Sequence, residues 1–396
     1  MKILFIAPSL PVNNGAGHAI RSYQIYNELK AFASVDVITA SSVGVSFPLI
    51  KEFRKSNSYI SHVDIDWKEY FFGLSYPLSK DLEKILSENE YDYVFIRYFN
   101  TAYRLGAFKL SNLILDCDDC ILELMCQQDN TENQGLLKTL LSKISNRSKE
   151  RNYVNNLRRV NGVIFSKVSS KMQWENNFYL APNKIKLVPI ASEDRKNKNF
   201  VTILFVGVLN YAPNYEGLFH FVSKIFPGVV AACSNVRLKI VGSGLPPEYY
   251  KAWSKNPNIE ICGYVPDINS VYADVDIAIA PIYKGSGTHI KVMEALVRSI
   301  AMVISPLAHR GYEHSLLDSD SLFVADSVEL FTQRVIELSQ NSGLRKAMGS
   351  KGRKAIISHH AIENSRSDIE KLFGQLEKNK QTLSKSEKPI YEGAYE

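Results

Sequence analysis

The sequence predicts an α/β protein with two doubly wound domains that face each other across a cleft. Three observations predict this fold class. Short apolar runs alternate with longer amphipathic ones, the short runs are apolar at every position, and the series restarts near residue 200. Continuous apolar runs indicate strands that are covered on both faces, as in parallel sheets. A chain of 396 residues is long enough for roughly two to three domains.

The first half of the chain carries predicted strands with helical patterns between them. Ala19–Leu29, Leu82–Leu86 and Leu136–Leu157 show the apolar spacing that is typical of amphipathic helices. The predicted strands are Ile3–Ala7, Val35–Thr39, Tyr93–Ile96, Leu113–Leu115, Val163–Ser166 and Ile185–Val188.

The second half repeats this pattern. Its opening Ile203–Phe205 resembles Ile3–Phe5 at the start of the chain, and the polar stretch Ser192–Asn199 separates the two series. We therefore expect domains over residues 1–195 and 196–360, a helix over 361–378 that packs back on the first domain, and a flexible tail over 379–396. The predicted strands of this half are Ile203–Val206, Val236–Val241, Ile259–Cys262, Val275–Ala280, Ala301–Ser305 and Leu322–Ala325.

Composition excludes several classes of protein. Lys and Arg number 47 against 41 Asp and Glu, and this mild excess argues against nucleic acid as the main partner. Five cysteines form no disulfide framework and suit a reducing compartment, and the pair Cys117 and Cys120 lacks the further ligands of a zinc site. No apolar run reaches the about 18 residues of a membrane span. We expect a cytoplasmic protein whose apolar start is a buried strand.

The densest chemical signal follows the fourth predicted strand of the second half. Gly285 and Gly287 permit a tight turn whose backbone N–H groups face an anion. Thr288 suits the N-cap of a helix whose N-terminus favours a phosphate. Lys291 then lies one turn inside the helix, with Glu294 at i+3 on the same face. Three residues rise by about 4.5 Å, a suitable step from a diphosphate to its ribose.

This pattern predicts a nucleotide site, with Lys291 at the diphosphate and Glu294 at the ribose hydroxyls. The alternative is that the two residues form only an i,i+3 ion pair at the surface. Lysine before glutamate is the less stabilising order for such a pair, which leaves this alternative with little support.

Short pieces in a fixed order also carry a family resemblance. On these pieces the chain from about Ile203 to Lys354 resembles the retaining glycosyltransferases of family 4, in the group 1 glycosyl transferases, which have the GT-B architecture. The first half fits more loosely, through Gly15-x-Gly17-His18 and Leu115-Asp116-x-x-Asp119. The pieces of the second half are Phe205-Val206-Gly207 with Pro213-Asn214, Ile240-Val241-Gly242-Ser243-Gly244, Gly263-Tyr264-Val265, Ala273-Asp274-Val275-Asp276 with Pro281, Gly285-x-Gly287-Thr288-x-x-Lys291-x-x-Glu294-Ala295, and Leu344-Arg345-x-x-Met348-Gly349.

The resemblance implies a fold, an activity and partners. It implies two Rossmann-like domains, with the acceptor on residues 1–195 and the nucleotide-sugar donor on 196–360. It implies that a sugar moves with retention from a nucleotide-sugar, a UDP-sugar being favoured, to a glycan, a lipid-linked or a small-molecule acceptor. No metal and no other cofactor is expected. The implied setting is the biosynthesis of a surface polysaccharide or another glycoconjugate.

The resemblance also implies roles for single residues. Lys291, His18 and Glu294 are the implied catalytic residues, and His18 and Asp119 are candidates on the acceptor side. For His18, capping of the first helix is the structural alternative. The implied donor-binding residues are Gly15, Gly17, Gly207, Gly242, Gly244, Tyr264, Val265, Gly285, Ser286, Gly287, Thr288, His289, Lys291 and Glu294.

Several positions depart from the family pattern. Ser286 stands where many members have the first of two glutamates. Val208 or Leu209, and Glu216, stand where many members have an arginine and a lysine. His289 is then a partial substitute for the missing positive charge. Further candidates for that charge are Arg21, Arg298, His309 and Arg310.

Other polar clusters have simpler interpretations. Asp116 to Asp119 contain a D-x-D motif, which holds Mn²⁺ or Mg²⁺ in one-domain glycosyltransferases. The restart of the strand series favours Asp116 as a strand-end residue that caps nearby backbone. His359 and His360 are expected at the surface. The stripe of Arg147, Arg151 and Arg158 suits a solvated helix face or, as the alternative, the inner surface of a membrane.

Two other classes of function stay open at this point. A non-enzymatic GT-B protein that binds a nucleotide-sugar or a partner protein would explain Ser286 and Glu216. A nucleotide-sugar epimerase would share the fold. The sequence predicts no oligomeric state.

Overall fold

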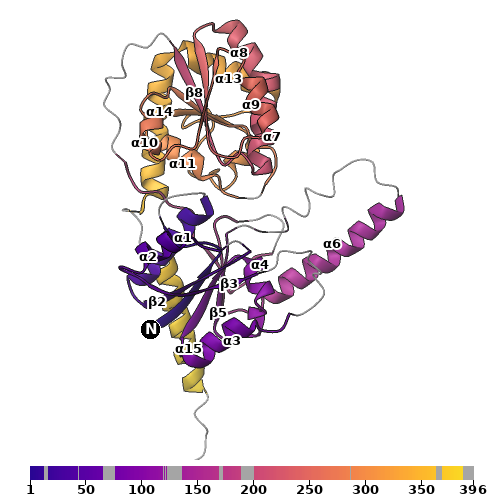
Figure 1. Ribbon diagram of the computed structural model, residues 1–396, viewed down its shortest axis with the longest axis vertical. Helices are drawn as coiled ribbons and strands as arrows, with labels where there is room; N and C mark the ends of the chain where they lie inside the picture. Colours follow the sequence, from indigo (N-terminus) through magenta and orange to yellow (C-terminus); the bar gives the residue numbers. More distant parts are fainter. Residues whose placement is uncertain are drawn as a thin grey trace, which may run out of the picture.

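Two parallel sheets with interleaved helices form the protein, and they confirm the predicted fold class (Figure 1). The computed structural model describes residues 1–12, 17–42, 44–65, 76–118, 120, 122, 136–168, 173–188, 200–285, 287–362 and 368–386. The expected boundary stretch Ser192–Asn199 and the last ten residues of the expected tail lie outside these ranges.

The first sheet has seven strands in the order β3-β2-β1-β4-β5-β6-β7. Every neighbouring pair is parallel, and Ile3 of β1 pairs with both Val35 and Tyr93. The chain order reverses between β1 and β4, which makes this the switch point of the sheet. The strands are β1 (Lys2–Ala7), β2 (Ser34–Ser41), β3 (Ser58–Asp64), β4 (Tyr93–Arg97), β5 (Leu113–Asp118), β6 (Gly162–Phe165) and β7 (Phe178–Leu180).

Helices cover both faces of the first sheet. Side chains of a strand alternate between faces, so Ile3 and Phe5 join one apolar cluster and Leu4 and Ile6 join the other. The first face is covered by α1, α2 and α15, and the second by α3, α4 and α6. These elements are α1 (Gly17–Lys30), α2 (Phe47–Phe53), α3 (Lys80–Glu88), α4 (Phe99–Arg104), the short η1 (Ala107–Lys109), α6 (Leu136–Leu157) and α15 (Asp368–Ser386).

The second sheet repeats the same topology with six parallel strands, in the order β10-β9-β8-β11-β12-β13. Its switch point lies between β8 and β11. The strands are β8 (Val201–Val206), β9 (Val236–Val241), β10 (Ile259–Gly263), β11 (Ile277–Ala280), β12 (Ala301–Ile304) and β13 (Phe323–Val324). The helices are α7 (Ala212–His220), η2 (Phe221–Ile225), α8 (Phe226–Ala232), α9 (Pro247–Trp253), α10 (Ile268–Tyr272), α11 (Ile290–Leu296), α12 (Pro306–His309), α13 (Val328–Gln340) and α14 (Ser342–His360).

Two strands of the first sheet differ from the prediction. Strand β3 was not predicted, because only Tyr59, Val63 and the adjoining Ile65 are buried in it. Ile185–Val188 is not a strand, and Ile185 forms only an isolated bridge with Ala361. Strand β7 takes the edge position instead, and it is short and only partly buried, so its apolar signal is weak.

The C-terminal helix α15 packs on the first sheet, far in sequence from the strands it covers (Figure 1). Phe373 is buried beside Tyr93 of β4, with ring centroids 5.2 Å apart. The chain reaches α15 past the Ile185–Ala361 bridge, where the two connections between the halves lie side by side. One continuous chain thus leaves the first sheet, forms the second, and returns.

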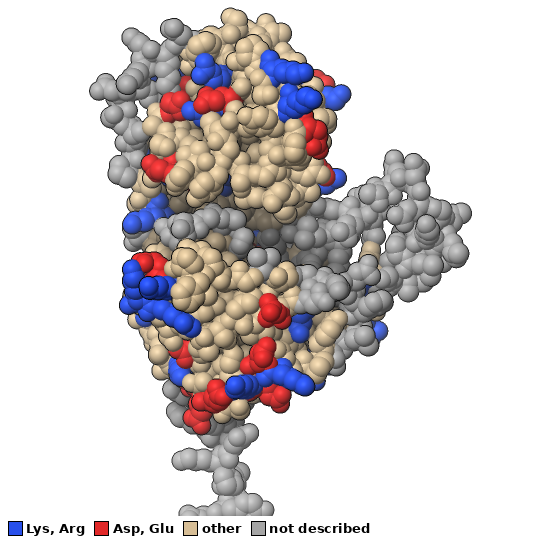
Figure 2. Space-filling view, viewed as in Figure 1, with Lys and Arg blue, Asp and Glu red and all other residues tan. Residues whose placement is uncertain are grey.

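Charged side chains of both signs are mixed on both lobes of the face drawn in Figure 2. No helix in the described part of the chain combines the length and the apolar character that a membrane crossing requires.

Candidate active site

The carboxyl ends of the second sheet bring together segments that are far apart in sequence. Gly242, after β9, has φ +148°, and a Cβ there would lie 1.7 Å from the carbonyl oxygen of Gly207. A Cβ on Gly207, after β8, would lie 2.9 Å from Asn214 Nδ2 and 3.0 Å from Lys291 Nζ. Both positions therefore need glycine, because the backbone and these side chains fill the space that a Cβ would take.

Lys291 occupies the switch point of the second sheet. Its ammonium donates to Asn214 Oδ1 at 2.8 Å and lies 4.5 Å from the ring centroid of Phe205 in β8. Asn214 Nδ2 in turn donates to the carbonyl oxygen of Val208 at 2.9 Å, which turns the amide oxygen toward the lysine. Burial lowers the pKa of Lys291 to about 7, against the opposing charge of Glu294. Lys291 is thus a cation that the fold places at the usual ligand position of a doubly wound sheet.

Glu294 lies one turn further along α11. Burial raises the pKa of this carboxyl group, while Arg298 and Lys291 act in the opposite direction. Arg298 donates to the carbonyl oxygen of Glu294 at 2.7 Å and to Asn269 Oδ1 at 2.7 Å. The structure contains no ion pair between Lys291 and Glu294, both of which it describes, so the surface-pair interpretation of this motif is wrong.

The N-cap residue of helix α11 differs from the predicted one. Helix α11 begins at Ile290, so His289 and not Thr288 holds the N-cap position, and its side chain makes no capping bond. Thr288 Oγ1 instead forms a hydrogen bond with Ser166 Oγ at 2.9 Å. Gly285 has φ +116°, and Ser286 lies outside the described residues.

His289 is held by its backbone. Its carbonyl oxygen accepts a hydrogen bond from the Tyr312 hydroxyl at 3.0 Å. Burial lowers the pKa of the imidazole to about 3, and the charges of Lys291 and Lys167 lower it further. The ring is therefore neutral near pH 7, and its Nε2 is buried without a hydrogen-bond partner in the part of the chain that the structure describes. A neutral imidazole cannot supply the positive charge that the sequence analysis expected from His289.

The remaining predicted donor residues lie at neighbouring strand ends. Gly242 N donates to the carbonyl oxygen of Gly263 at 2.8 Å, which joins the ends of β9 and β10. Tyr264 follows directly and is 72% exposed, with Val265 beside it partly buried. Gly244 has φ +83° and lies against Asn210. Gly287 directly precedes Thr288 and follows Ser286, which lies outside the described residues.

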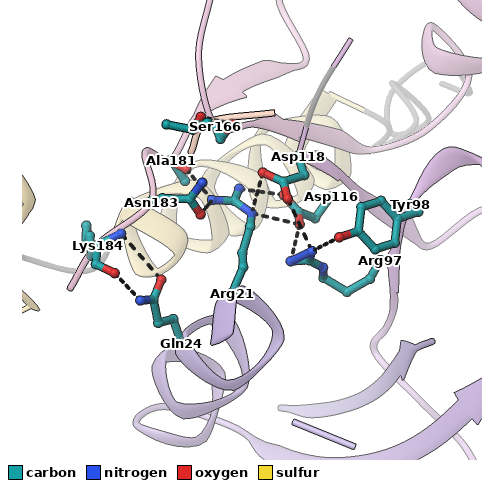
Figure 3. A network of polar contacts seen from close by, with 11 residues as sticks. Arg21, Gln24, Arg97, Tyr98, Asp116, Asp118, Ser166, Ala181, Asn183 and Lys184 are labelled. Atoms are coloured by element: carbon teal, nitrogen blue, oxygen red, sulfur yellow. Dashed lines mark hydrogen bonds and ion pairs between the residues drawn. The ribbon is translucent and has the colours of Figure 1, made fainter. Parts of the chain in front are cut away.

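The first sheet carries a buried network of charges at its own carboxyl end (Figure 3). Arg21 of α1 donates two hydrogen bonds to Asp116 of β5, through Nη2 to Oδ1 at 2.7 Å and through Nε to Oδ2 at 3.2 Å. Arg97 of β4 approaches the same carboxylate at 3.1 Å and donates to the Tyr98 hydroxyl at 2.8 Å. Both arginines also lie near Asp118, at 3.3 and 3.5 Å.

Two arginines and two aspartates balance each other in this network. Burial disfavours the charges of Arg21, Arg97 and Asp116, yet Asp116 and Asp118 raise the pKa of Arg21, and Arg21 and Arg97 lower that of Asp116. Asp116 thus pairs with arginines, and its carboxylate also accepts a hydrogen bond from the backbone of Asp118, as expected for a strand-end residue. Arg21 is engaged here, so it is not the additional cation for the phosphates.

The network shapes the turns at this edge. Asp118 has φ +60° and Tyr98 has φ +73°, conformations that side-chain-bearing residues seldom adopt. The Asp118 carbonyl oxygen accepts a hydrogen bond from Ser166 N at 2.7 Å, and Asp116 O accepts one from Tyr98 N at 2.7 Å. Among the described residues no group of three or more His, Cys, Asp or Glu side chains is arranged to hold a metal ion.

Some predicted residues of the first half cannot be placed. Gly15 and Asp119 lie outside the described residues, and Gly17 and His18 are the first two residues of α1. The sequence analysis assigned no site role to Asn214, Arg97 or Ser166. Ser166 ends a predicted strand, and in a parallel sheet that position is itself a signal for a site residue.

The two sheets meet through their carboxyl edges. The hydrogen bond between Ser166, directly after β6, and Thr288, in the loop before α11, joins residues 122 positions apart. The structure therefore brings Gly207, Lys291, Glu294, Thr288 and His289 into one region and sets the edge of the first sheet against it.

Comparisons with known proteins agree with this architecture. Residues 201–341 match the family described as Glycosyl transferases group 1. The chain is also 24% identical over 173 residues to an uncharacterized 44.6 kDa protein in the cps region of Klebsiella pneumoniae. That match covers 42% of this chain and 44% of the relative, less than half the length of either.

Solved structures match over nearly the full length. HepE of Anabaena in complex with UDP-glucose superimposes with a TM-score of 0.63 at 14% identity, covering 96% of this chain and 100% of that one. WaaG, a glycosyltransferase involved in lipopolysaccharide biosynthesis, superimposes with a TM-score of 0.60 at 16% identity, covering 91% and 96%. Identities this low show a shared fold. Residues 201–341 are thus similar to the group 1 glycosyl transferases, and the two halves of the chain together have the GT-B fold.

Proposed function

We propose that the protein transfers a sugar, with retention, from a nucleotide-sugar to a glycan, lipid-linked or small-molecule acceptor. One observation carries this proposal. Lys291 lies at the switch point of the sheet, inside the segment that matches the glycosyl transferases, with its ammonium held between Asn214 and Phe205. In sugar transfer the departing group is a nucleoside diphosphate, on which negative charge develops, and a preorganised cation stabilises that charge.

Lys291 and Glu294 would bind different parts of the nucleotide-sugar donor. Lys291 is suited to the diphosphate because a bound anion raises the pKa of a buried amine and keeps it charged. Glu294 offers two acceptor oxygens for the ribose hydroxyls, one helical turn away. The acceptor would then lie against the first sheet, where the charge network fixes the turns at Tyr98 and Asp118.

The identity of the donor is supported by a structural neighbour. HepE has been observed with UDP-glucose, and its chain covers almost all of this one. We therefore propose a UDP-sugar as the donor. WaaG and the relative in the cps region support a place in the biosynthesis of a surface polysaccharide.

Transfer would need no metal ion. In the D-x-D motif, Asp116 and Asp118 face Arg21 and Arg97, so their charges are already balanced. Transfer measured in the presence of EDTA should match transfer without it, and abolition by EDTA would contradict this part of the proposal.

The first test is calorimetric binding of UDP, GDP, ADP and dTDP to the full chain. We expect UDP to bind, and Glu294→Gln to weaken it by about tenfold or more, the usual effect of losing a hydrogen bond to a charged group. Glu329→Gln is the matched control, because Glu329 is exposed at the start of α13.

Each outcome separates two interpretations. Binding of UDP together with sugar transfer or slow hydrolysis of UDP-glucose supports the enzyme. Tight binding of UDP-glucose that leaves it intact with every acceptor tried would favour a non-enzymatic binding protein. No binding of any of the four nucleotides would contradict the proposed function.

A further inference from the structure

A buried lysine from the first half of the chain lies beside the candidate donor site. Lys167 is two residues beyond β6 and only 7% exposed. The preceding Ser166 forms the hydrogen bond to Thr288 at 2.9 Å. A Cβ added to Gly311 would lie 3.3 Å from Lys167 Cβ, 3.4 Å from its Cδ and 3.4 Å from Thr288 Cγ2. The aliphatic part of Lys167 therefore runs along the loop that precedes α11.

Lys167 and Lys291 both lie near the neutral imidazole of His289. The pKa of His289 is lowered by burial and then by Lys291 and Lys167, so both ammonium charges act on one imidazole. Glu294 is the carboxylate whose charge acts on Lys291. Lys167 lies beside Thr288 at one side of the loop before α11 and Lys291 follows that loop, so a polyvalent anion bound there would interact favourably with both lysines.

We infer that Lys167 is a second cation for the diphosphate of the donor, contributed by the first half of the chain across the junction of the two halves. This inference rests on the proposed function and adds a binding residue to its site. A diphosphate carries several negative charges, and an ammonium group binds phosphate as a point charge. Lys291 then meets the diphosphate from the second sheet, and Lys167 meets it from the first.

This arrangement makes the donor site depend on both halves. Lys291 and Glu294 belong to α11, whereas Lys167 belongs to the segment after β6. The Ser166–Thr288 hydrogen bond joins the two segments directly. A bound diphosphate would thus hold the halves together at their carboxyl edges.

The test compares UDP with uridine, which has the same base and ribose but no phosphate. Both are titrated by calorimetry into the wild type, Lys167→Met, Lys167→Arg and the control Lys351→Met. Lys351 forms an exposed ion pair with Asp320 and serves as a matched surface lysine. We expect Lys167→Met to weaken UDP binding by about tenfold or more, and to leave uridine binding unchanged. Lys167→Arg and Lys351→Met should bind UDP within about threefold of the wild type.

The outcomes distinguish this inference from the proposed function. A folded Lys167→Met that binds UDP as tightly as the wild type would overturn the role of Lys167 and leave the proposed function in place. Equal weakening of UDP and uridine would show a structural role and would also overturn it. A wild type that binds neither UDP nor any other nucleoside diphosphate would overturn the proposed function itself. If Lys167→Met fails to fold, Lys167→Gln compared with Lys167→Arg carries the same test.

Discussion

At the scale of single residues, burial decides how each charge of this protein behaves. Lys291 is partly buried and Asp116 is fully buried, and the two groups have opposite surroundings. Lys291 is held by a neutral amide, so its charge is costly and its pKa is lowered to about 7. Asp116 lies between two arginines, so its negative charge is favoured and the arginines lower its pKa. Lys291 is therefore suited to bind an anion, whereas Asp116 already forms ion pairs with two arginines.

The free energy of unfolding should reveal the state of Lys291. Its pKa is about 7 in the folded protein and 10.5 for an ordinary lysine. Between these values the unfolded chain holds more protons, so the free energy of unfolding rises with pH in this window. Urea unfolding at pH 7, 8 and 9 should show a smaller rise for Lys291→Met than for the wild type. Lys351→Met should keep the wild-type rise, and an unchanged rise in Lys291→Met would show that Lys291 is charged throughout.

Removal of the Asp116 charge should destabilise the protein strongly. Asp116→Asn leaves Arg21 and Arg97 buried without this carboxylate, and breaking a buried pair typically costs about 3–5 kcal/mol. Urea unfolding followed by circular dichroism measures the loss. The control Asp320→Asn breaks an exposed pair with Lys351 and should cost less than about 1 kcal/mol. Equal losses in the two variants would mean that the network contributes no more than a surface pair.

At the scale of elements, helices are held by the faces they cover. Helix α11 has seven residues, too few to be stable alone in water. Four of them, Val292, Met293, Ala295 and Leu296, are buried in the core of the second sheet, which leaves Lys291 and Glu294 on the opposite side. Helix α15 covers the first sheet in the same way, although it is the last element of the chain.

Helix α15 should therefore contribute to the stability of the first sheet. Phe373→Ala removes a ring that is 2% exposed and that contacts Phe32 and Tyr93. We expect the free energy of unfolding to fall by about 3–5 kcal/mol, as for other buried aromatic side chains. Phe47→Ala, at a site that is 73% exposed, should change it by about 0.5 kcal/mol or less. A small loss for Phe373→Ala would indicate that α15 detaches without disturbing the sheet.

At the scale of the whole molecule, the two halves touch at their sheet edges and at the connecting segments. His360 lies at the second place. Its Nδ1 donates to the carbonyl oxygen of Asn183 at 3.1 Å, and its Nε2 accepts from the Ser315 hydroxyl at 3.0 Å. The ring is 5% exposed, so the expected surface position of His360 is wrong. Burial, with His359 and Lys184 nearby, lowers its pKa.

A lower pH should reduce the free energy of unfolding through His289, near the sheet edges, and through His360, at the connecting segments. His289 and His360 have lowered pKa values in the folded protein. Below about pH 6.5 these histidines are therefore protonated in the unfolded chain but stay neutral in the folded protein. The free energy of unfolding then falls with falling pH, by up to about 1.4 kcal/mol per pH unit for each histidine. His289→Asn and His360→Asn should each reduce this dependence between pH 6.5 and 5. His314→Asn, at an exposed position, should keep it, and an unchanged slope in both buried variants would contradict the assignment.

Much of the fold followed from local patterns. The apolar runs at Ile3–Ala7 and Ile203–Val206 became β1 and β8 because a buried strand needs apolar residues at every position. The family pieces in the second half also led to Lys291 and Glu294. The half-buried edge strands β3 and β7 escaped prediction, since such strands mix polar and apolar residues without a clear period.

The sequence by itself determined which segments are buried, where the chain turns, and that a cation and a carboxylate share one face of α11. These properties depend on neighbouring residues, so they can be read along the chain. Only the tertiary structure decided which distant groups meet. Arg21 and Asp116 are 95 positions apart, Lys291 and Asn214 are 77 apart, and Ser166 and Thr288 are 122 apart. Such contacts depend on the order of strands in each sheet and on how two sheets face each other, and no local pattern encodes either.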